Sequence, residues 1–244
     1  MICIKRAARA CSAGGYAAGM LEMTTRDFTA PYGRLESWVY DTFLAPATAA
    51  LADTLGGDWF EHVPRGGALC DVGCGGGQLV TSLARRRPDL RVTGLDRSKE
   101  QIARARRRAA RARVRVELVE GSALALPFAD ATFDQVVSVA SIKHWPDQAR
   151  GLAECVRVLA PGGRLLVAEA DRGCHLDDAR RFVARTRLPR AARPLALPAF
   201  RTWVAGRGID LDDARALLAG LAITDARVTR TPGAPALLLE ARRA

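Results

Sequence analysis

A glycine-rich turn is the feature that most constrains the fold of this chain. Four glycines fall within residues 73–77 of the stretch CDVGCGGGQLV, and a short apolar run precedes them. A buried strand that ends in glycines before a helix is typical of open parallel sheets, in which ligands bind outside the carboxyl ends of the strands. Glycine also lets the backbone approach a ligand closely. The turn therefore predicts a ligand site at this edge of an α/β sheet.

The spacing of the glycines limits which ligand fits. The loop reads Gly-x-Gly-x-Gly from Gly73 to Gly77, whereas a dinucleotide fingerprint needs its third glycine where this chain has Gln78. A phosphate loop does not fit either, because no Gly-Lys-Ser/Thr is present. The second signal is Asp96, 23 residues after Gly73, where a carboxylate can accept both ribose hydroxyls of an adenosine. Alone, Asp96 could instead cap a helix before Ser98; together with the loop, the ligand interpretation is favoured.

Apolar strands and amphipathic helices alternate through the middle of the chain. Strands are predicted at residues 67–73, 91–96, 114–121, 135–141 and 164–170. Helices are predicted between them, at residues 77–88, 98–114 and 147–163. A final helix over residues 210–221 precedes two short strands around Pro232 and Gly233. The predicted fold class is α/β: a Rossmann-like, doubly wound, mostly parallel sheet of seven strands, with an antiparallel last strand and a helical lid.

The length of 244 residues favours one large domain with an insertion. The alternation breaks over residues 172–208, where prolines interrupt a helical segment, and this stretch is predicted to be the lid. Residues 29–60 show helical periodicity and are predicted to be an N-terminal cap of the single domain, which spans residues 29–244. Residues 1–28 lack the apolar stretch of a secretory signal and are interpreted as a disordered leader or a mis-annotated start. No apolar run is long enough to span a bilayer.

Positive charge is concentrated in one segment. The formal net charge is +11, and residues 85–115 carry 13 basic and three acidic side chains. Because 34 of the 37 basic residues are arginine, the excess fits a GC-rich genome as well as it fits selection for phosphate contacts. Two interpretations stay open: a solvated helix face, or a footprint for RNA or an anionic substrate.

Four motifs stand in order along the chain: LCDVGCGGGQLV, VTGLDRS, VELVEGSALALPFADATFDQVVSVASIKHWPD and ECVRVLAPGGRLLVAE. Together they resemble the class I S-adenosylmethionine-dependent methyltransferases, in particular the small-molecule branch of ubiquinone- and menaquinone-biosynthesis type. The resemblance covers residues 32–170. It implies S-adenosyl-L-methionine as the cofactor and a small molecule as the methyl acceptor.

The resemblance also implies a role for each matching residue. Asp71 would orient the glycine loop near the methionine amino group, Asp96 would hold the ribose hydroxyls, and Arg97 would flank the adenine. Ser122 stands where the family usually has an aspartate, so a charged contact to the adenine amino group is missing. The implied cofactor-binding residues are Asp71, Gly73, Cys74, Gly75, Gly77, Asp96, Arg97, Ser122, Ala123 and Ala140.

The segment SIKHWPD, after the fourth predicted strand, holds the candidates for chemistry. Methyl transfer from a sulfonium needs positioning, with a base where the acceptor requires one. His144 is the candidate catalytic base, although it could instead orient the loop or pack on Trp145. Lys143 could be a solvated loop charge or a partner for an anionic acceptor. Asp147 is expected to cap the following helix.

Other classes of protein lack their marks in this sequence. Six scattered cysteines without a Cys-x-x-Cys pair, and only three histidines, predict no metal site and a reduced, cytoplasmic protein. The leading hypothesis is transfer of a methyl group to a carbon or oxygen of a small, mostly apolar metabolite. The alternatives are an RNA methyltransferase, a non-catalytic S-adenosylmethionine-binding protein and, last, an NAD-dependent dehydrogenase.

Overall fold

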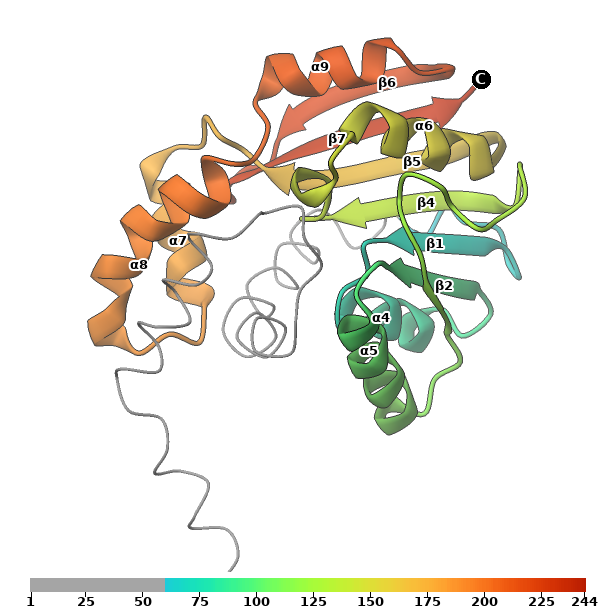
Figure 1. Ribbon diagram of the computed structural model, residues 1–244, viewed down its shortest axis with the longest axis horizontal. Coiled ribbons are helices and arrows are strands. Elements are labelled where there is room, and N and C mark those ends of the chain that lie inside the picture. Colours follow the sequence, from blue (N-terminus) through green and yellow to red (C-terminus); the bar gives the residue numbers. More distant parts are fainter. Residues whose placement is uncertain (1–59) are drawn as a thin grey trace, which may run out of the picture.

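The computed structural model describes residues 60–244, apart from the side chain of Trp203. The predicted leader (1–28) and all but the last residue of the predicted cap (29–60) therefore lie outside the described residues. The described part forms one mixed sheet with helices on both faces (Figure 1). Its strands are β1 (Ala68–Val72), β2 (Arg91–Asp96), β3 (Glu117–Glu120), β4 (Phe133–Val139), β5 (Leu159–Ala170), β6 (Ile223–Arg230) and β7 (Ala236–Arg243).

Helices connect these strands as the alternation predicts. The α-helices are α4 (Gln78–Arg86), α5 (Lys99–Ala112), α6 (Gln148–Val158), α7 (Leu176–Arg185), α8 (Arg193–Ala199) and α9 (Leu211–Ala219). Shorter helical turns are η2 (Ile142–His144), η3 (Arg190–Ala192) and the π-helical η4 (Phe200–Ala205). Within residues 60–244, no helix combines the length and the apolar character needed to cross a membrane.

The sheet has the strand order β3-β2-β1-β4-β5-β7-β6. The first five strands in this order pair in parallel, and β7 runs antiparallel to both of its neighbours, β5 and β6. The chain order reverses between β1 and β4, so the carboxyl ends of these two strands border the crevice where ligands bind in open α/β sheets. The predicted fold class, a seven-stranded doubly wound sheet with an antiparallel last strand, is confirmed.

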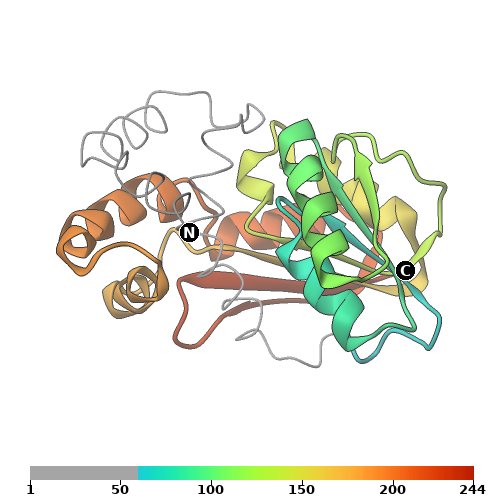
Figure 2. The same cartoon turned by 90° about the horizontal axis from the view of Figure 1, so that it is seen from below.

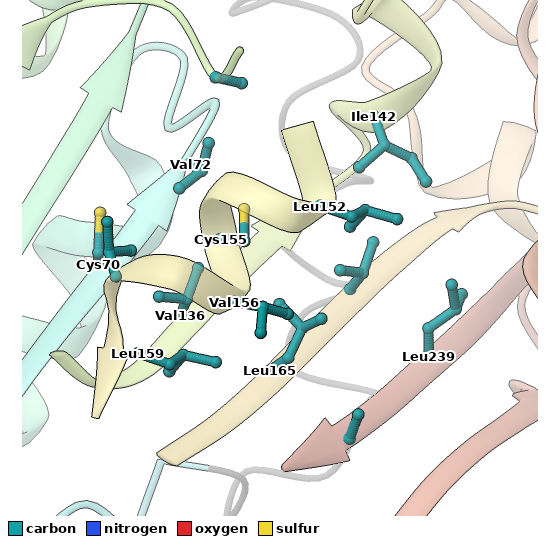
Figure 3. Close-up of a cluster of buried hydrophobic side chains, with 14 of the residues drawn as sticks. Cys70, Val72, Val136, Ile142, Leu152, Cys155, Val156, Leu159, Leu165 and Leu239 are labelled. Carbon is teal, nitrogen blue, oxygen red and sulfur yellow. The ribbon is translucent and has the colours of Figure 1, made fainter. Parts of the chain in front are cut away.

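One face of the sheet packs against α6 and α9. Along β1 the side chains alternate, and Cys70 and Val72 join the cluster that contains Leu152 and Cys155 of α6 (Figure 3). These four side chains are fully buried. This cluster also includes Ile142, so the turn that follows β4 is held directly by the core.

The opposite face of the sheet packs against α4 and α5. Leu69, on the other side of β1, lies in a second cluster with Val80 and Leu83 of α4 and Ile102 of α5. The helix α5 begins at Ser98, whose side-chain oxygen accepts a hydrogen bond from the backbone N–H of Gln101. Both helices are thereby fixed against β1 and β2, with the glycine-rich turn at the start of α4.

The stretch predicted as a lid, residues 172–208, contains α7, η3, α8 and η4. Its ends meet at an isolated bridge between Asp171 and Ile209, so the whole segment leaves and rejoins the sheet at one point. Phe182 and Phe200 contact each other within it, with ring centroids 4.7 Å apart. In both views α7 and α8 lie together on the opposite side of the molecule from α4 and α5 (Figures 1 and 2).

Three details differ from the sequence-based expectation. The third strand was expected over 114–121, but only Glu117–Glu120 pairs with β2. The fifth was expected over 164–170, but it begins at Leu159, which pairs with Phe133 before a register shift. The connection over 125–134 was expected to allow one helical turn; the structure has an isolated bridge from Ser122 to Ala125 there. Proline and glycine at 161–163 mark the bend after which the β5–β4 pairing resumes, rather than the start of the strand.

Candidate functional site

The glycine loop lies between the ends of β1, β2 and β4. Gly73 has a φ of +85°, and its backbone N–H donates to the carbonyl of Leu95 at 2.7 Å. A Cβ at this position would lie 1.8 Å from Oγ of Ser141, so only glycine fits. Gly75 also has a positive φ, of +52°, but no heavy atom of the described residues lies within 4 Å of where its Cβ would be. The loop is thus closed below Gly73 and open above Gly75.

Cys74 and Gly77 support the loop from behind. Neither lines the cleft described below. The side chain of Cys74 is buried, and its Sγ would lie 2.9 Å from a Cβ placed on Gly94 of β2. A Cβ on Gly77 would lie 2.7 Å from Cβ of Ala105, so this glycine allows α4 and α5 to approach each other. The structure therefore gives both residues a packing role in the position of the loop.

Asp96 ends β2 and bonds both neighbouring segments. Its Oδ2 accepts the backbone N–H of Gly75 at 2.9 Å, and its Oδ1 accepts that of Ser98 at 2.8 Å. Burial raises the pKa of Asp96, while these two donors and the charge of Arg97 lower it. Ser98, rather than Asp96, is the N-cap of α5. Each carboxylate oxygen keeps a lone pair for a further donor, such as a ribose hydroxyl.

Asp71 lies beneath the loop on β1. Its side chain is 2% exposed, and Oδ1 has no hydrogen-bond partner among the described residues. Burial, followed by the charge of Asp96, raises the pKa of Asp71 to about 8. Asp71 does not line the cleft. A buried carboxyl without a partner is an acceptor suited to a cationic group placed over the loop.

A cleft opens where the strands β1, β2 and β4 end. Of the residues proposed from the sequence, it brings together Gly73, Gly75, Asp96, Arg97, Ser122, Ala123, Ala140 and His144. The lining also includes residues that sequence reasoning missed: Leu95, Ser98, Gln101, Gly121, Leu124, Val139, Ser141, Trp145 and Pro146. Ala140 has a φ of +54°, and its N–H donates to the carbonyl of Ala168, which holds the turn after β4 in a sparsely populated conformation.

Gln101 is the most informative residue that the sequence reasoning missed. It lies in the first turn of α5, is 3% exposed and lines the cleft. Its Oε1 has no hydrogen-bond partner in the described part of the chain. By contrast, the hydroxyl of Ser122 is exposed and accepts the backbone N–H of Leu124. An amide on the buried stripe of α5, next to Ile102, was the available sequence signal.

A buried ion pair fixes the turn after β4. Nζ of Lys143 lies 2.7 Å from Oε1 of Glu169, and the two side chains are 5% and 0% exposed. Nζ also donates to the carbonyl of Ala140, and the backbone N–H of Lys143 donates to Oε2 of Glu169. Neither interpretation of Lys143 from sequence is correct, because its charge is neither solvated nor directed at a ligand. The pair instead positions His144 and Trp145.

The remaining side chains of this turn have structural partners. Nε1 of Trp145 donates to Oγ of Ser141 at 3.1 Å, and the indole packs against Gly151 of α6. Asp147 caps α6 as expected, accepting the backbone N–H of Arg150 at 2.9 Å. His144 remains in the lining of the cleft.

Comparisons with known proteins agree with this geometry. Residues 70–167 match the family model described as a methyltransferase domain. These residues form a methyltransferase domain. The match begins at the last residues of β1 and ends in β5, so it contains the glycine loop, Asp96 and the turn after β4. The resemblance of this region to the class I S-adenosylmethionine-dependent methyltransferases is confirmed.

Two relatives and one solved structure illustrate the likeness of the methyltransferase domain. The 27-O-demethylrifamycin SV methyltransferase of Amycolatopsis mediterranei is 38% identical over 128 residues, 52% of this chain and 46% of that protein. The demethylmenaquinone methyltransferase of Thermus thermophilus is 41% identical over 109 residues, 45% and 49% of the two chains. The chain thus spans about half the length of these relatives. A SAM-dependent methyltransferase from Aquifex aeolicus shares the fold, with a TM-score of 0.60 at 15% identity, over 92% of this chain and 98% of that one.

Proposed function

We propose that this chain transfers a methyl group from S-adenosyl-L-methionine to a carbon or oxygen of a small, mostly apolar acceptor. The observation that carries the proposal is the carboxylate of Asp96, fixed by two backbone donors beside the open side of Gly75. A carboxylate at this place is suited to two vicinal hydroxyls of a ribose. The match of residues 70–167 to methyltransferase domains supports the same ligand.

The residues present fit the adenosyl part of this cofactor. The ribose would lie against Asp96, with the backbone of Gly73 and Gly75 beneath it. Gln101 has a buried oxygen without a partner in the same cleft, within residues 60–244, and we assign it to a donor of the adenosine. That assignment compensates for Ser122, which brings no charge to the adenine edge.

The methionine part fits the opposite side of the loop. The carboxyl of Asp71 would accept the methionine ammonium and become ionised in doing so, since a nearby cation favours the charged form. The turn at Ala140 and Ser141 would line the side from which the methyl group leaves. When bound, the cofactor supplies a methyl group already activated on a sulfonium.

Chain residues then contribute position and, where needed, a base. Since the donor is activated, alignment of the acceptor supplies most of the acceleration. His144 lines the cleft next to this turn, and it would take the proton of an acceptor hydroxyl or of an acidic carbon. Lys143 and Glu169 act through His144 by holding its turn.

The acceptor class follows from the relatives and from the inserted helices. One relative is named for a demethylrifamycin and another for demethylmenaquinone, both extended and largely apolar molecules. The insertion offers apolar side chains in Phe182, Leu188 and Leu197, which pack on its own small core. An aromatic hydroxyl or hydroquinone is therefore the proposed acceptor, and the cytoplasm is the proposed location.

Binding and transfer are tested separately. Titration calorimetry with S-adenosylhomocysteine should show binding that Asp96→Asn weakens about 10- to 100-fold, the loss expected for two hydrogen bonds to a charged group. Glu120→Gln, an exposed carboxylate paired with Asp96 across β2 and β3, is the control and should bind as the unchanged chain does. Binding of NAD without binding of S-adenosylhomocysteine would refute the cofactor.

Transfer is assayed with a methyl-labelled donor and a panel of hydroquinones, phenols and polyketides. Label should appear in at least one acceptor, and His144→Gln should lower kcat while leaving the affinity for S-adenosylhomocysteine within about twofold. A chain that binds S-adenosylhomocysteine yet labels no acceptor would favour a non-catalytic binding protein.

A further inference from the structure

A second, larger cleft lies between α4 and α5, on the side of the helices away from the sheet. Its volume is about 1000 Å³. The described residues that line it are Gln78, Thr81, Ser82, Arg85, Arg86, Arg104, Arg107, Arg108, Arg111 and Ala112. Only Gln78 belongs to the strand-to-helix turn, and none of these residues lines the candidate cofactor cleft. We call this surface the arginine cleft.

The arginine cleft concentrates positive charge without local compensation. Six of its lining residues are arginines from two helices, and among the described residues that line it none is acidic. Arg85, Arg107 and Arg111 are exposed and form no ion pair with any residue that the structure describes. Guanidinium groups of like charge that converge on one hollow repel one another until an anion enters. The charge excess noted in residues 85–115 is thus directed, in part, into one concave site.

Other contacts hold the site in place before any ligand binds. The guanidinium of Arg86 lies over the ring of Phe60, 4.6 Å from its centroid. Nε of Arg108 donates to the carbonyl of Gly76 at 2.8 Å. Thr81, also in the lining, is 6% exposed, and its hydroxyl has no hydrogen-bond partner within the described range. A buried hydroxyl without a partner is an available donor for an oxygen of a ligand.

We propose that the arginine cleft binds a compact polyanion made of several linked phosphate groups. Guanidinium groups match phosphate oxygens with two parallel hydrogen bonds, and several of them together select a ligand with several adjacent phosphates. The hollow is large enough for such a chain and concave on the scale of a small ligand. No aromatic side chain is present among the described lining residues, so bases have nothing to stack on, which disfavours single-stranded nucleic acid. The proposal does not depend on methyl transfer.

The probe is inorganic tripolyphosphate, titrated calorimetrically into the full chain in 0.15 M NaCl. Arg107→Ala with Arg111→Ala should weaken its binding about tenfold or more, because two charge-assisted contacts are lost. The matched control, Arg91→Ala with Arg115→Ala, removes the same charge from exposed residues of the same segment outside the cleft, and should change affinity less than twofold.

A third variant leaves the charge unchanged. Thr81→Val keeps the shape of the side chain and removes the hydroxyl, and it should weaken tripolyphosphate about threefold if the hydroxyl faces the ligand. Circular dichroism and the urea midpoint confirm that each variant is folded; alanine in exposed turns of α5 favours the helix.

Three results would overturn the proposal. Equal weakening by the two double variants would show a diffuse charge effect rather than a site. Absence of tripolyphosphate binding even at 50 mM NaCl would show that the cleft holds no such ligand. Tighter binding of single-stranded or duplex RNA, lost in the same Arg107 and Arg111 variant, would make the surface a nucleic-acid interface instead.

Discussion

Replacing Asp71 with asparagine separates the stability of the fold from its affinity for the cofactor. The carboxyl is buried, has an Oδ1 without a partner in residues 60–244, and has its pKa raised to about 8 from an ordinary 3.8, chiefly by burial. Asparagine keeps the shape of the side chain and is neutral at every pH. The substitution therefore removes the cost of ionising a buried group and, with it, the negative charge proposed to accept the methionine ammonium.

The size of the effect follows from the shift in the pKa of Asp71. Between pH 3.8 and about 8 the folded chain keeps a proton that the unfolded chain releases, so the free energy of unfolding decreases as pH rises. The stabilising difference is fully present below pH 3.8 and is lost through about pH 8. At about 1.4 kcal/mol per unit, the whole window is on the order of 5 kcal/mol.

Urea unfolding at a series of pH values measures this dependence. The unchanged chain should lose stability from pH 5 to 8, whereas Asp71→Asn should lack that component and be the more stable chain at pH 8.5. Asp225→Asn, which removes an exposed carboxylate, should keep the original slope. If the unchanged chain and Asp71→Asn give parallel curves, the buried carboxyl is not protonated as argued.

The same carboxyl makes cofactor binding release a proton. At pH 7 a group with a pKa of about 8 is about nine-tenths protonated, and an ammonium placed beside Asp71 would ionise it. Calorimetry with S-adenosylhomocysteine in buffers of different ionisation enthalpy should therefore report release of about 0.9 proton at pH 7. Asp71→Asn should release none and bind more weakly. Equal proton release by both chains would refute the assignment of Asp71 to the amino group.

Further predictions concern the loop, the ion pair and the amide. Gly73→Ala should destabilise the fold by about 2–4 kcal/mol in urea unfolding, because its Cβ would meet Oγ of Ser141 at a positive φ; Ser141→Gly in the same chain should restore part of this. Glu169→Gln should cost about 3 kcal/mol or more by leaving the ammonium of Lys143 buried without a carboxylate, and adding Lys143→Met should recover stability rather than lose more. Gln101→Met should raise the urea midpoint yet weaken S-adenosylhomocysteine about fivefold, since a buried oxygen that lacks a partner in the described chain is removed; a change of the same sign in both would contradict its assignment to the ligand.

Much of the fold could be predicted because local patterns and the sheet agree. Each of the first five strands is a short apolar run, and each helix has one apolar stripe, so the alternation already implies parallel pairing. The ends of β3 and β5 could not be predicted, because they depend on pairing partners. Val114 and Val116 look like strand residues, yet β3 pairs with β2 only from Glu117 onward.

The site divides in the same way. The glycine loop and Asp96 could be found because their chemistry is written in consecutive residues. The ion pair of Lys143 and Glu169 could not, because the two residues are 26 positions apart and meet only when β5 lies beside β4. Gln101 was overlooked because a polar residue in a helix rich in arginine looks solvated until the packing of α5 buries it.

The place of β7 in the sheet has a consequence for how this chain is made. β7 follows β6 in the chain but lies between β6 and β5, so β6 cannot join the sheet before β7 has left the ribosome. Until then the edge of β5 from Leu165 to Ala170, buried in the finished protein, has no partner strand. An open apolar edge invites pairing with another copy. Slow translation across residues 231–235, between β6 and β7, should therefore lower soluble yield more than slow translation in a helix of equal length.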